Sequence, residues 1–124
     1  MRMSRVEAAA RLALEFGEAF NRHDLEGIAQ LLDEDCVLET TGPAPEGNTL
    51  RGKGAVLAFW ERFFRQMQDV RLEVEEVYGL GTRSLLRWRR HWTDAAGRTF
   101  RLRGVDIFKV VDGRICEQIS YVKG

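Results

Sequence analysis

The chain has 124 residues, of which 44% are hydrophobic and 31% are charged, a composition typical of a globular protein that excludes a disordered one. Its 19 basic residues balance its 19 acidic residues, so no net positive charge is available to attract nucleic acid. The length is that of one ordinary domain, and we expect residues 1–124 to form a single domain.

The N-terminus and the cysteines bear on the cellular compartment. Charged residues interrupt the apolar positions of residues 1–16, and no apolar run approaches the length of a membrane span. Cys36 and Cys116 lie in predicted strands without the close spacing of metal ligands, as expected for small core residues in a reducing compartment. We therefore expect a cytoplasmic protein with no membrane contact.

Three helices are predicted in the first half of the chain. Between residues 4 and 23, apolar residues recur at the spacing of an amphipathic helix. Asp24 can cap a second, short helix, and a third with a broad aromatic face is expected over residues 56–67. His23 is expected in a solvated loop before the Asp24 cap.

One strand is predicted before the third helix and four strands after it. The segment 36–40 is short and β-prone, and residues 41–54 hold both prolines and four of the twelve glycines, so a long loop is expected there. Four further strands are predicted, over residues 70–78, 84–93, 99–111 and 114–122. The predicted class is therefore α+β, with the helices on one face of a curved, antiparallel or mixed sheet.

Asp106 is the most informative residue. Within its predicted strand it shares a face with Phe100, Leu102, Phe108 and Val110, because side chains alternate along a strand. A carboxyl group on so apolar a face must be paired, hydrogen-bonded or protonated. Nearby arginines make a structural ion pair one interpretation, and a proton donor or base inside a ligand cavity is the other.

The neighbours of Asp106 depend on two turns. A hairpin centred on Ala96 brings Leu86, Trp88, Arg90 and Trp92 to its face, whereas a shift by one residue brings Arg87, Arg89 and His91 instead. We favour the first register because tryptophans suit a cavity wall. A three-residue turn at 111–113 aligns Gln118 and Ser120 with Asp106, and a two-residue turn aligns Ile119 and Tyr121.

The candidate site residues follow from this pattern. We propose Asp106 and His91 as candidate catalytic residues, and either Glu39 or Thr40, of which only one can face inward, at the rim. The candidate pocket residues are Phe16, Phe20, Thr40, Trp60, Trp88, Leu102 and Gln118. No phosphate-binding loop, nucleophile elbow or paired-histidine motif is present, so we expect neither a metal nor a cofactor.

The stretches "FGEAFNRHDLEGIAQLLDEDCVLET", "LRGKGAVLAFWERFF" and "GVDIFKVVDGRICEQISYVKG" resemble the superfamily of nuclear transport factor 2, ketosteroid isomerase and the SnoaL-like polyketide cyclases. The resemblance implies a cone of three helices and a bent sheet closing on an apolar pocket. It also places Phe16 at the oxyanion-binding tyrosine of ketosteroid isomerases, Thr40 (or Glu39 after a one-residue shift) at their general base, and Asp106 at their aspartic acid donor. Since one of the three functional residues is retained, steroid isomerisation by that mechanism is not expected.

The resulting expectation is a SnoaL-like domain that binds a hydrophobic small molecule and performs cofactor-free acid–base chemistry of the isomerase, cyclase or dehydratase type, with Asp106 as donor or base. The alternative is a non-catalytic ligand-binding or homodimerisation module. Its dimer face would be the outer side of the sheet, comprising Arg87, Arg89, Arg101, Arg103, Ile107, Ile119 and Tyr121. A protein-docking adaptor is the third and least favoured reading.

Overall fold

A computed structural model describes residues 5–123 of the chain, and within them three helices and six strands. The helices are α1 (Arg5–Asn21), α2 (Leu25–Leu31) and α3 (Lys53–Gln66). The strands are β1 (Leu32–Glu39), β2 (Thr49–Arg51), β3 (Arg71–Leu80), β4 (Arg83–Thr93), β5 (Thr99–Val111) and β6 (Arg114–Lys123). The expected first residue of the first helix, Ser4, lies outside the described residues.

The six strands form one mixed sheet in the order β2-β1-β6-β5-β4-β3. Strand β1 runs parallel to β6, and the other neighbours are antiparallel. The predicted start of the first strand at residue 36 was wrong, because β1 begins at Leu32, directly after α2. The prediction of an unbroken loop over residues 41–54 was also wrong, since residues 49–51 pair with β1 and residues 53–54 begin α3.

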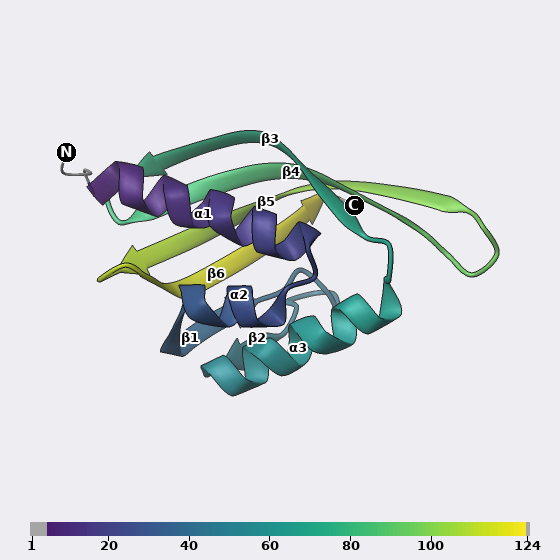
Figure 1. The fold of residues 1–124 in the computed structure, drawn as a ribbon, viewed down its shortest axis with the longest axis horizontal. Helices are drawn as coiled ribbons and strands as arrows, with labels where there is room; N and C mark the ends of the chain where they lie inside the picture. Colours follow the sequence, from purple (N-terminus) through teal and green to yellow (C-terminus); the bar gives the residue numbers. More distant parts are fainter. Residues whose placement is uncertain (1–4, 124) are drawn as a thin grey trace.

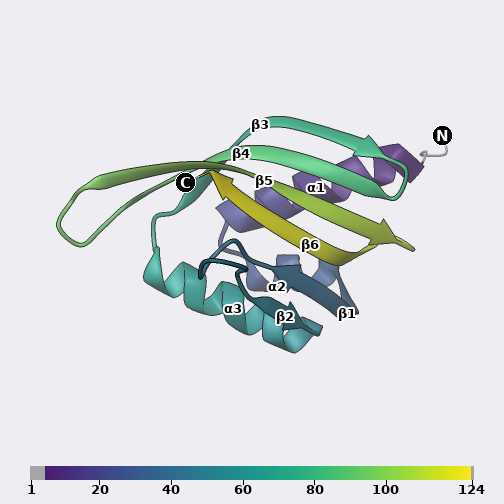
Figure 2. The ribbon, with the colours of Figure 1, turned by 180° about the vertical axis from the view of Figure 1, so that it is seen from behind.

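All three helices lie on one face of the curved sheet, as Figure 1 and the view from behind in Figure 2 show. Helix α1 packs across β3 and β4, while α3 packs beside β1. The hairpin of β4 and β5 extends well beyond the helical layer (Figure 1). This is the predicted α+β arrangement, a bent sheet wrapped on helices. No helix among residues 5–123 is long and apolar enough to cross a bilayer.

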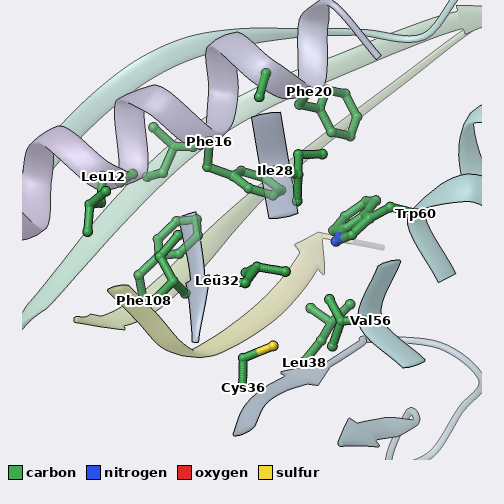
Figure 3. Close-up of a cluster of buried hydrophobic side chains, with 14 of the residues drawn as sticks. Leu12, Phe16, Phe20, Ile28, Leu32, Cys36, Leu38, Val56, Trp60 and Phe108 are labelled. Carbon is green, nitrogen blue, oxygen red and sulfur yellow. The ribbon is translucent and has the colours of Figure 1, made fainter. Parts of the chain in front are cut away.

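The core fills the space between the helices and the sheet (Figure 3). Phe16 of α1 is its centre, with its ring 5.5 Å from both the Trp60 and the Phe108 rings. Phe20, one turn further along α1, meets the same Trp60 ring edge-on at 5.8 Å. Aromatic contacts of this kind join α1, α3 and β5 and stabilise the cone beyond simple burial of apolar area.

The β4–β5 hairpin has the favoured register. Thr93 pairs with Thr99, so the turn centres on Ala96, and Leu86 pairs with Asp106. Arg90 and Trp88 therefore share the inner face with Asp106, as predicted, and His91 lies on the outer face.

The β5–β6 hairpin combines features of both alternatives. Its turn has two residues, Asp112 and Gly113, both with positive φ, as in the tight turns that connect twisted strands. Ser120 nevertheless pairs with Asp106, because the register shifts between Lys109 and Val110 and leaves Cys116 as an extra residue in β6. The bulge thus restores the inward alignment of Gln118 and Ser120 that we linked to a three-residue turn.

Two polar residues fasten the end of α1 to the start of β3. The Asn21 side chain donates to the Leu72 carbonyl at 2.8 Å and accepts from the Leu72 amide at 2.7 Å. The ring of His23 stacks on Phe64 at 4.5 Å, and its Nε2 lies 2.9 Å from the Val70 carbonyl oxygen. The prediction of a solvated His23 was therefore wrong: the ring is part of a packed junction.

Candidate functional site

Asp106 is buried on the inner face of the sheet, with 3% of its surface exposed. Leu86 of β4 and Ser120 of β6 lie directly beside it. The Gln118 side-chain amide donates to Asp106 Oδ2 at 2.9 Å. The other oxygen, Oδ1, has no hydrogen-bond partner among the described residues.

The environment of Asp106 shifts its titration toward higher pH. Burial raises the pKa of its carboxyl group, because a carboxylate loses more hydration energy than a carboxylic acid does. The Ser120 and Gln118 side chains, and more weakly the Arg90 charge, act in the opposite direction without cancelling the effect. A neutral carboxylic acid can donate through an oxygen that a carboxylate uses only to accept.

A cavity of about 220 Å³ opens between the sheet, α3 and the loop before β2. Its wall is aromatic on the α3 side and mixed polar and aliphatic on the other side. The lining residues are Leu38, Thr40, Thr41, Gly42, Asn48, Phe59, Trp60, Phe63, Arg90, Ser120 and Val122. Most small-molecule pockets measure about 300–1,000 Å³, so this one suits a small ligand or one end of a larger ligand.

The loop of the cavity rim is tied to β6 by one hydroxyl group. Thr41 Oγ1 donates to the Ser120 carbonyl at 2.7 Å and accepts from the Val122 amide at 2.8 Å. Thr40 Oγ1 donates to the Gly42 carbonyl and accepts from the Asn48 amide, which closes the loop on itself. These bonds hold the loop over the end of the cone.

The structure separates the predicted pocket residues into three groups. Thr40 and Trp60 line the cavity. Glu39, the last residue of β1, points to the opposite face from Leu38, which is a lining residue. Phe16, Phe20, Trp88 and Gln118 are buried core residues that are not part of the wall. Leu102 is half-buried beside an outer groove.

Asp106 itself lies one layer behind the cavity. It does not line the wall, but its strand partner Ser120 does, and so does Arg90, whose charge acts on it. Ser120 and Arg90 therefore connect the buried carboxyl group to the cavity. The register analysis of the sequence placed Ser120 and Arg90 on the face of Asp106. The sequence gave no signal that they form the polar part of the wall together with Thr41 and Asn48.

His91 lies apart from this site. Its side chain is exposed on the outer face of the sheet, because it has the opposite parity to Arg90 along β4. With Asp106 on the inner face, the two candidate catalytic residues are on opposite sides of the sheet. His91 can therefore not act on a ligand in the cavity.

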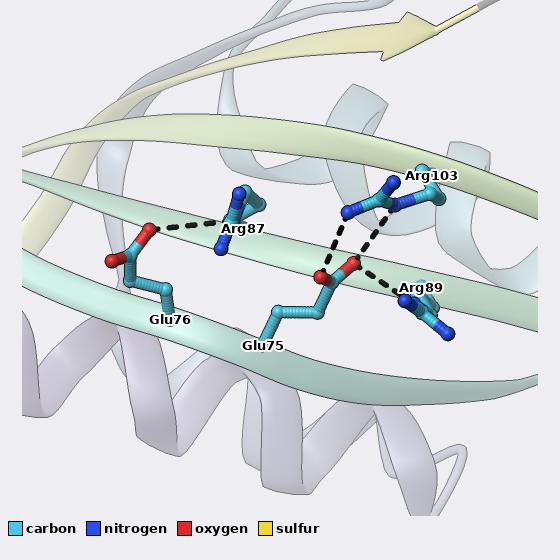
Figure 4. A network of polar contacts seen from close by, with 5 residues as sticks. All are labelled: Glu75, Glu76, Arg87, Arg89 and Arg103. Atoms are coloured by element: carbon cyan, nitrogen blue, oxygen red, sulfur yellow. Dashed lines mark hydrogen bonds and ion pairs between the residues drawn. The ribbon is translucent and has the colours of Figure 1, made fainter.

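The outer face carries Arg87, Arg89 and Arg103, three of the arginines that the sequence places close to Asp106 (Figure 4). Glu75 accepts from Arg103 at 3.0 and 3.1 Å and from Arg89 at 3.2 Å, and Arg87 pairs with Glu76 at 3.3 Å. Two consecutive glutamates can both face outward because the register of β3 shifts between Val74 and Glu76. These arginines are therefore neutralised by the outer glutamates, and none of them pairs with Asp106.

Arg90 is the exception among the arginines, since it points inward and is 9% exposed. Its guanidinium carbon lies 4.4 Å from the ring centre of Trp88 and 5.0 Å from that of Phe63. Burial lowers the pKa of Arg90, and the neighbouring Asp106 partly opposes this. Its Nε has no hydrogen-bond partner among residues 5–123.

The described part of the chain holds no group of three or more histidine, cysteine or acidic side chains that could share a metal ion. The chemistry available at the cavity is therefore that of hydroxyl groups, an amide, a guanidinium and, behind them, a carboxyl group.

The sequence was compared with models of known protein families. The family model of the SnoaL-like domain matches residues 13–118, which include the cavity wall up to β6 and Asp106. The chain belongs to the SnoaL-like domain family.

Solved structures place this SnoaL-like domain among cone-shaped proteins of the nuclear transport factor 2 type. A protein of unknown function from Mesorhizobium loti, described as like nuclear transport factor 2, is 35% identical, with a TM-score of 0.83 over 100% of this chain and 98% of its own. A candidate ketosteroid isomerase from Kribbella flavida is 23% identical, with a TM-score of 0.84 over 99% and 83% of the two chains. A candidate SnoaL-like polyketide cyclase from a Jannaschia species is 13% identical, with a TM-score of 0.85 over 99% and 90%. The last two establish the fold alone, and no curated protein matches the sequence significantly.

The SnoaL-like fold puts the three positions from the ketosteroid isomerase resemblance in distinct places. Phe16 is sealed in the core by Trp60 and Phe108, and its ring has no group to donate a hydrogen bond. Thr40 is on the cavity wall, while Glu39 faces away. A carboxyl group is thus found only at Asp106 among the three positions.

Proposed function

We propose that this SnoaL-like domain binds a small, largely hydrophobic carbonyl compound in the cavity and supplies a proton to it without a cofactor. The observation that carries the proposal is the buried Asp106, whose Oδ1 has no hydrogen-bond partner among residues 5–123 and whose strand partner Ser120 lies on the cavity wall. A buried acid kept neutral by an apolar site is a recognised way to donate to a developing oxyanion, and ketosteroid isomerase is the standard example of it.

The proposed proton path runs through Ser120. The protonated Asp106 carboxyl donates to Ser120 Oγ, and the Ser120 hydroxyl donates to the carbonyl oxygen of the ligand. As the carbonyl becomes an enol, the oxygen gains this proton and the adjacent carbon loses one to solvent. In an unsaturated compound, return of the enol proton to Ser120 and addition of a solvent proton at the conjugated carbon isomerises the compound. Attack of the enol carbon on a second carbonyl, whose oxygen takes up the proton released by the enol hydroxyl, cyclises it.

Hydrogen–deuterium exchange next to a carbonyl tests this proposal without the natural substrate. Small cyclic ketones, 2-tetralone and 1-indanone, are incubated with the protein in D₂O, and deuterium uptake is followed by NMR. We expect exchange faster than in buffer. Asp106→Asn is expected to lower the protein-dependent rate about 10²–10⁴-fold, the usual contribution of one acid–base residue.

Two further variants separate the proton path from general effects on the protein. Ser120→Ala should also lower the rate, whereas His91→Ala, on the outer face, should leave it unchanged. Exchange in the wild-type protein at the buffer rate, or unchanged exchange in Asp106→Asn, contradicts the catalytic part of the proposal.

A second function is favoured by the outer face of the sheet, which we propose to be the contact surface of a homodimer. None of the three described helices covers this face (Figure 2), and half-buried Val105, Ile107 and Ile119 lie there beside Tyr121, which is 55% exposed. Uncovered apolar stripes bordered by charged residues are typical of protein interfaces. Sedimentation equilibrium tests it: Ile119→Lys should dissociate a wild-type dimer, and a wild-type monomer at high concentration contradicts it.

A further inference from the structure

The starting observation is a buried cation that lacks a counter-ion. Arg90 forms no ion pair with any acidic side chain among residues 5–123, and its Nε has no hydrogen-bond partner there, although only 9% of its surface is exposed. The outer arginines 87, 89 and 103 each have a glutamate within 3.3 Å. Arg90 thus differs from its neighbours in sequence by being both more buried and unpaired.

A buried charge without a partner is costly, because the lost hydration is not replaced. Aromatic rings replace part of it: the guanidinium lies 4.4 Å from Trp88, 5.0 Å from Phe63 and 5.8 Å from Phe20. A ring against the guanidinium face stabilises the charge but offers no hydrogen-bond acceptor to its N–H groups. The Nε–H group has no acceptor among the described residues.

Asp106 does not supply a full counter-charge. Arg90 and Asp106 are the only charged residues among the buried side chains described, and their charged atoms do not come within ion-pair distance. Burial also raises the pKa of the Asp106 carboxyl group, which works against a full negative charge there. The site therefore has an excess of positive charge at the cavity wall.

We infer that Arg90 binds an acidic group of the ligand, so that the carbonyl compound taken up also carries a carboxylate on a small aromatic or unsaturated frame. This inference rests on the proposed function and specifies its ligand class. Phe59, Trp60 and Phe63 offer flat apolar surfaces to the ring, while Arg90 offers a planar set of donors that matches the two oxygens of a carboxylate. A cavity of about 220 Å³ has room for a small ring system.

A matched pair of probes tests the inference: 2-naphthoate and 2-naphthamide, which differ in charge but hardly in shape. Their dissociation constants are measured by NMR titration. We expect the wild-type protein to bind the acid about tenfold or more tightly than the amide, as a charge-assisted hydrogen bond in a buried site predicts. Arg90→Gln should abolish that preference while changing amide binding by less than about twofold.

The control variant is Arg89→Gln, one position along β4, whose arginine faces outward to Glu75. It should keep the preference for the acid. If Arg90→Gln does not fold, the wild-type protein still decides, because the Nε–Hε signal of Arg90 should shift with the acid and not with the amide.

The outcomes separate this inference from the proposed function. Equal binding of acid and amide, or a stationary Arg90 signal during saturation by the acid, overturns the anion site and leaves a neutral carbonyl ligand standing. Binding of neither probe contradicts the anion site and the hydrophobic cavity together. Loss of exchange catalysis in Asp106→Asn has no bearing on the preference at Arg90.

Discussion

Trp88 lies directly over Gly104, its cross-strand partner, on the inner face of the sheet. A Cβ atom at residue 104 would come within 2.6 Å of Trp88 Cζ2 and within 2.6 Å of the Tyr121 carbonyl oxygen. The indole ring can pack against the sheet only because residue 104 has no side chain. The same ring carries the Arg90 guanidinium on its face, so Gly104 indirectly sets the position of the cation at the cavity.

Gly104→Ala should destabilise the protein and disturb the site. The new methyl group meets a backbone oxygen and a large ring, neither of which can move aside easily, so we expect a loss of about 1–3 kcal/mol in the free energy of unfolding. Urea denaturation measures this loss, and the near-ultraviolet circular dichroism of the tryptophans should change as the indole ring shifts.

Gly54→Ala in α3 is the matched control. A Cβ there meets nothing within 4 Å, and alanine favours a helix, so stability should stay the same or rise by up to about 1 kcal/mol. If Gly104→Ala were as stable as Gly54→Ala, the close packing of Trp88 on the sheet would be wrong.

The buried acid should make stability fall as pH rises. The folded pKa of Asp106 is raised by burial, so the folded state binds its proton more tightly than the unfolded chain does. The stability from this difference is fully present below the unfolded pKa of about 4 and is lost as pH rises through the folded pKa. Asp106→Asn, which cannot ionise, should therefore gain stability relative to wild type between pH 4 and pH 8. A constant difference across this range would contradict the raised pKa.

Glu75 should show the opposite dependence. The Arg103 hydrogen bond, with help from Arg89, lowers the pKa of this carboxyl group, so its contribution is present above the unfolded pKa and lost as pH falls through the folded one. Glu75→Gln should be less stable than wild type near pH 7, and the two proteins should converge toward pH 3. If the stabilities of the two proteins also converge in high salt, solvent ions screen the ion pairs of Glu75 with Arg89 and Arg103.

The class of the fold and the face of Asp106 were predictable because both follow from periodicity. Apolar spacing located the three helices, and alternation placed Asp106 on the buried side of its strand. The hairpin at Ala96 was also predictable, since only that register puts Trp88 rather than two arginines inside.

The cavity wall was not predictable, because it depends on features without a local signature. Bulges at Cys116 and Glu75 change which side chains share a face, and nothing in the composition of either strand announces them. Strand β2 has three residues and forms only through its pairing with β1. Phe16, Phe20 and Trp88 were predicted to line the pocket because they are aromatic, yet the helices pack closely enough to make them core.

The Thr41 hydroxyl group holds the loop at the rim of the cavity, so it should affect access to the cavity. It holds the rim loop to β6 by donating to the Ser120 carbonyl and accepting from the Val122 amide. Thr41→Val keeps the shape of the side chain and removes both bonds, so we expect a loss of about 0.5–1.5 kcal/mol in stability and faster hydrogen exchange at the Val122 amide. Thr99→Val, at an exposed position of β5, is the control and should leave that amide unchanged. Because the loop closes the cavity beside Ser120, Thr41→Val should also release 2-naphthoate faster than wild type does. Unchanged exchange at Val122 would mean that the loop is held in place by other contacts.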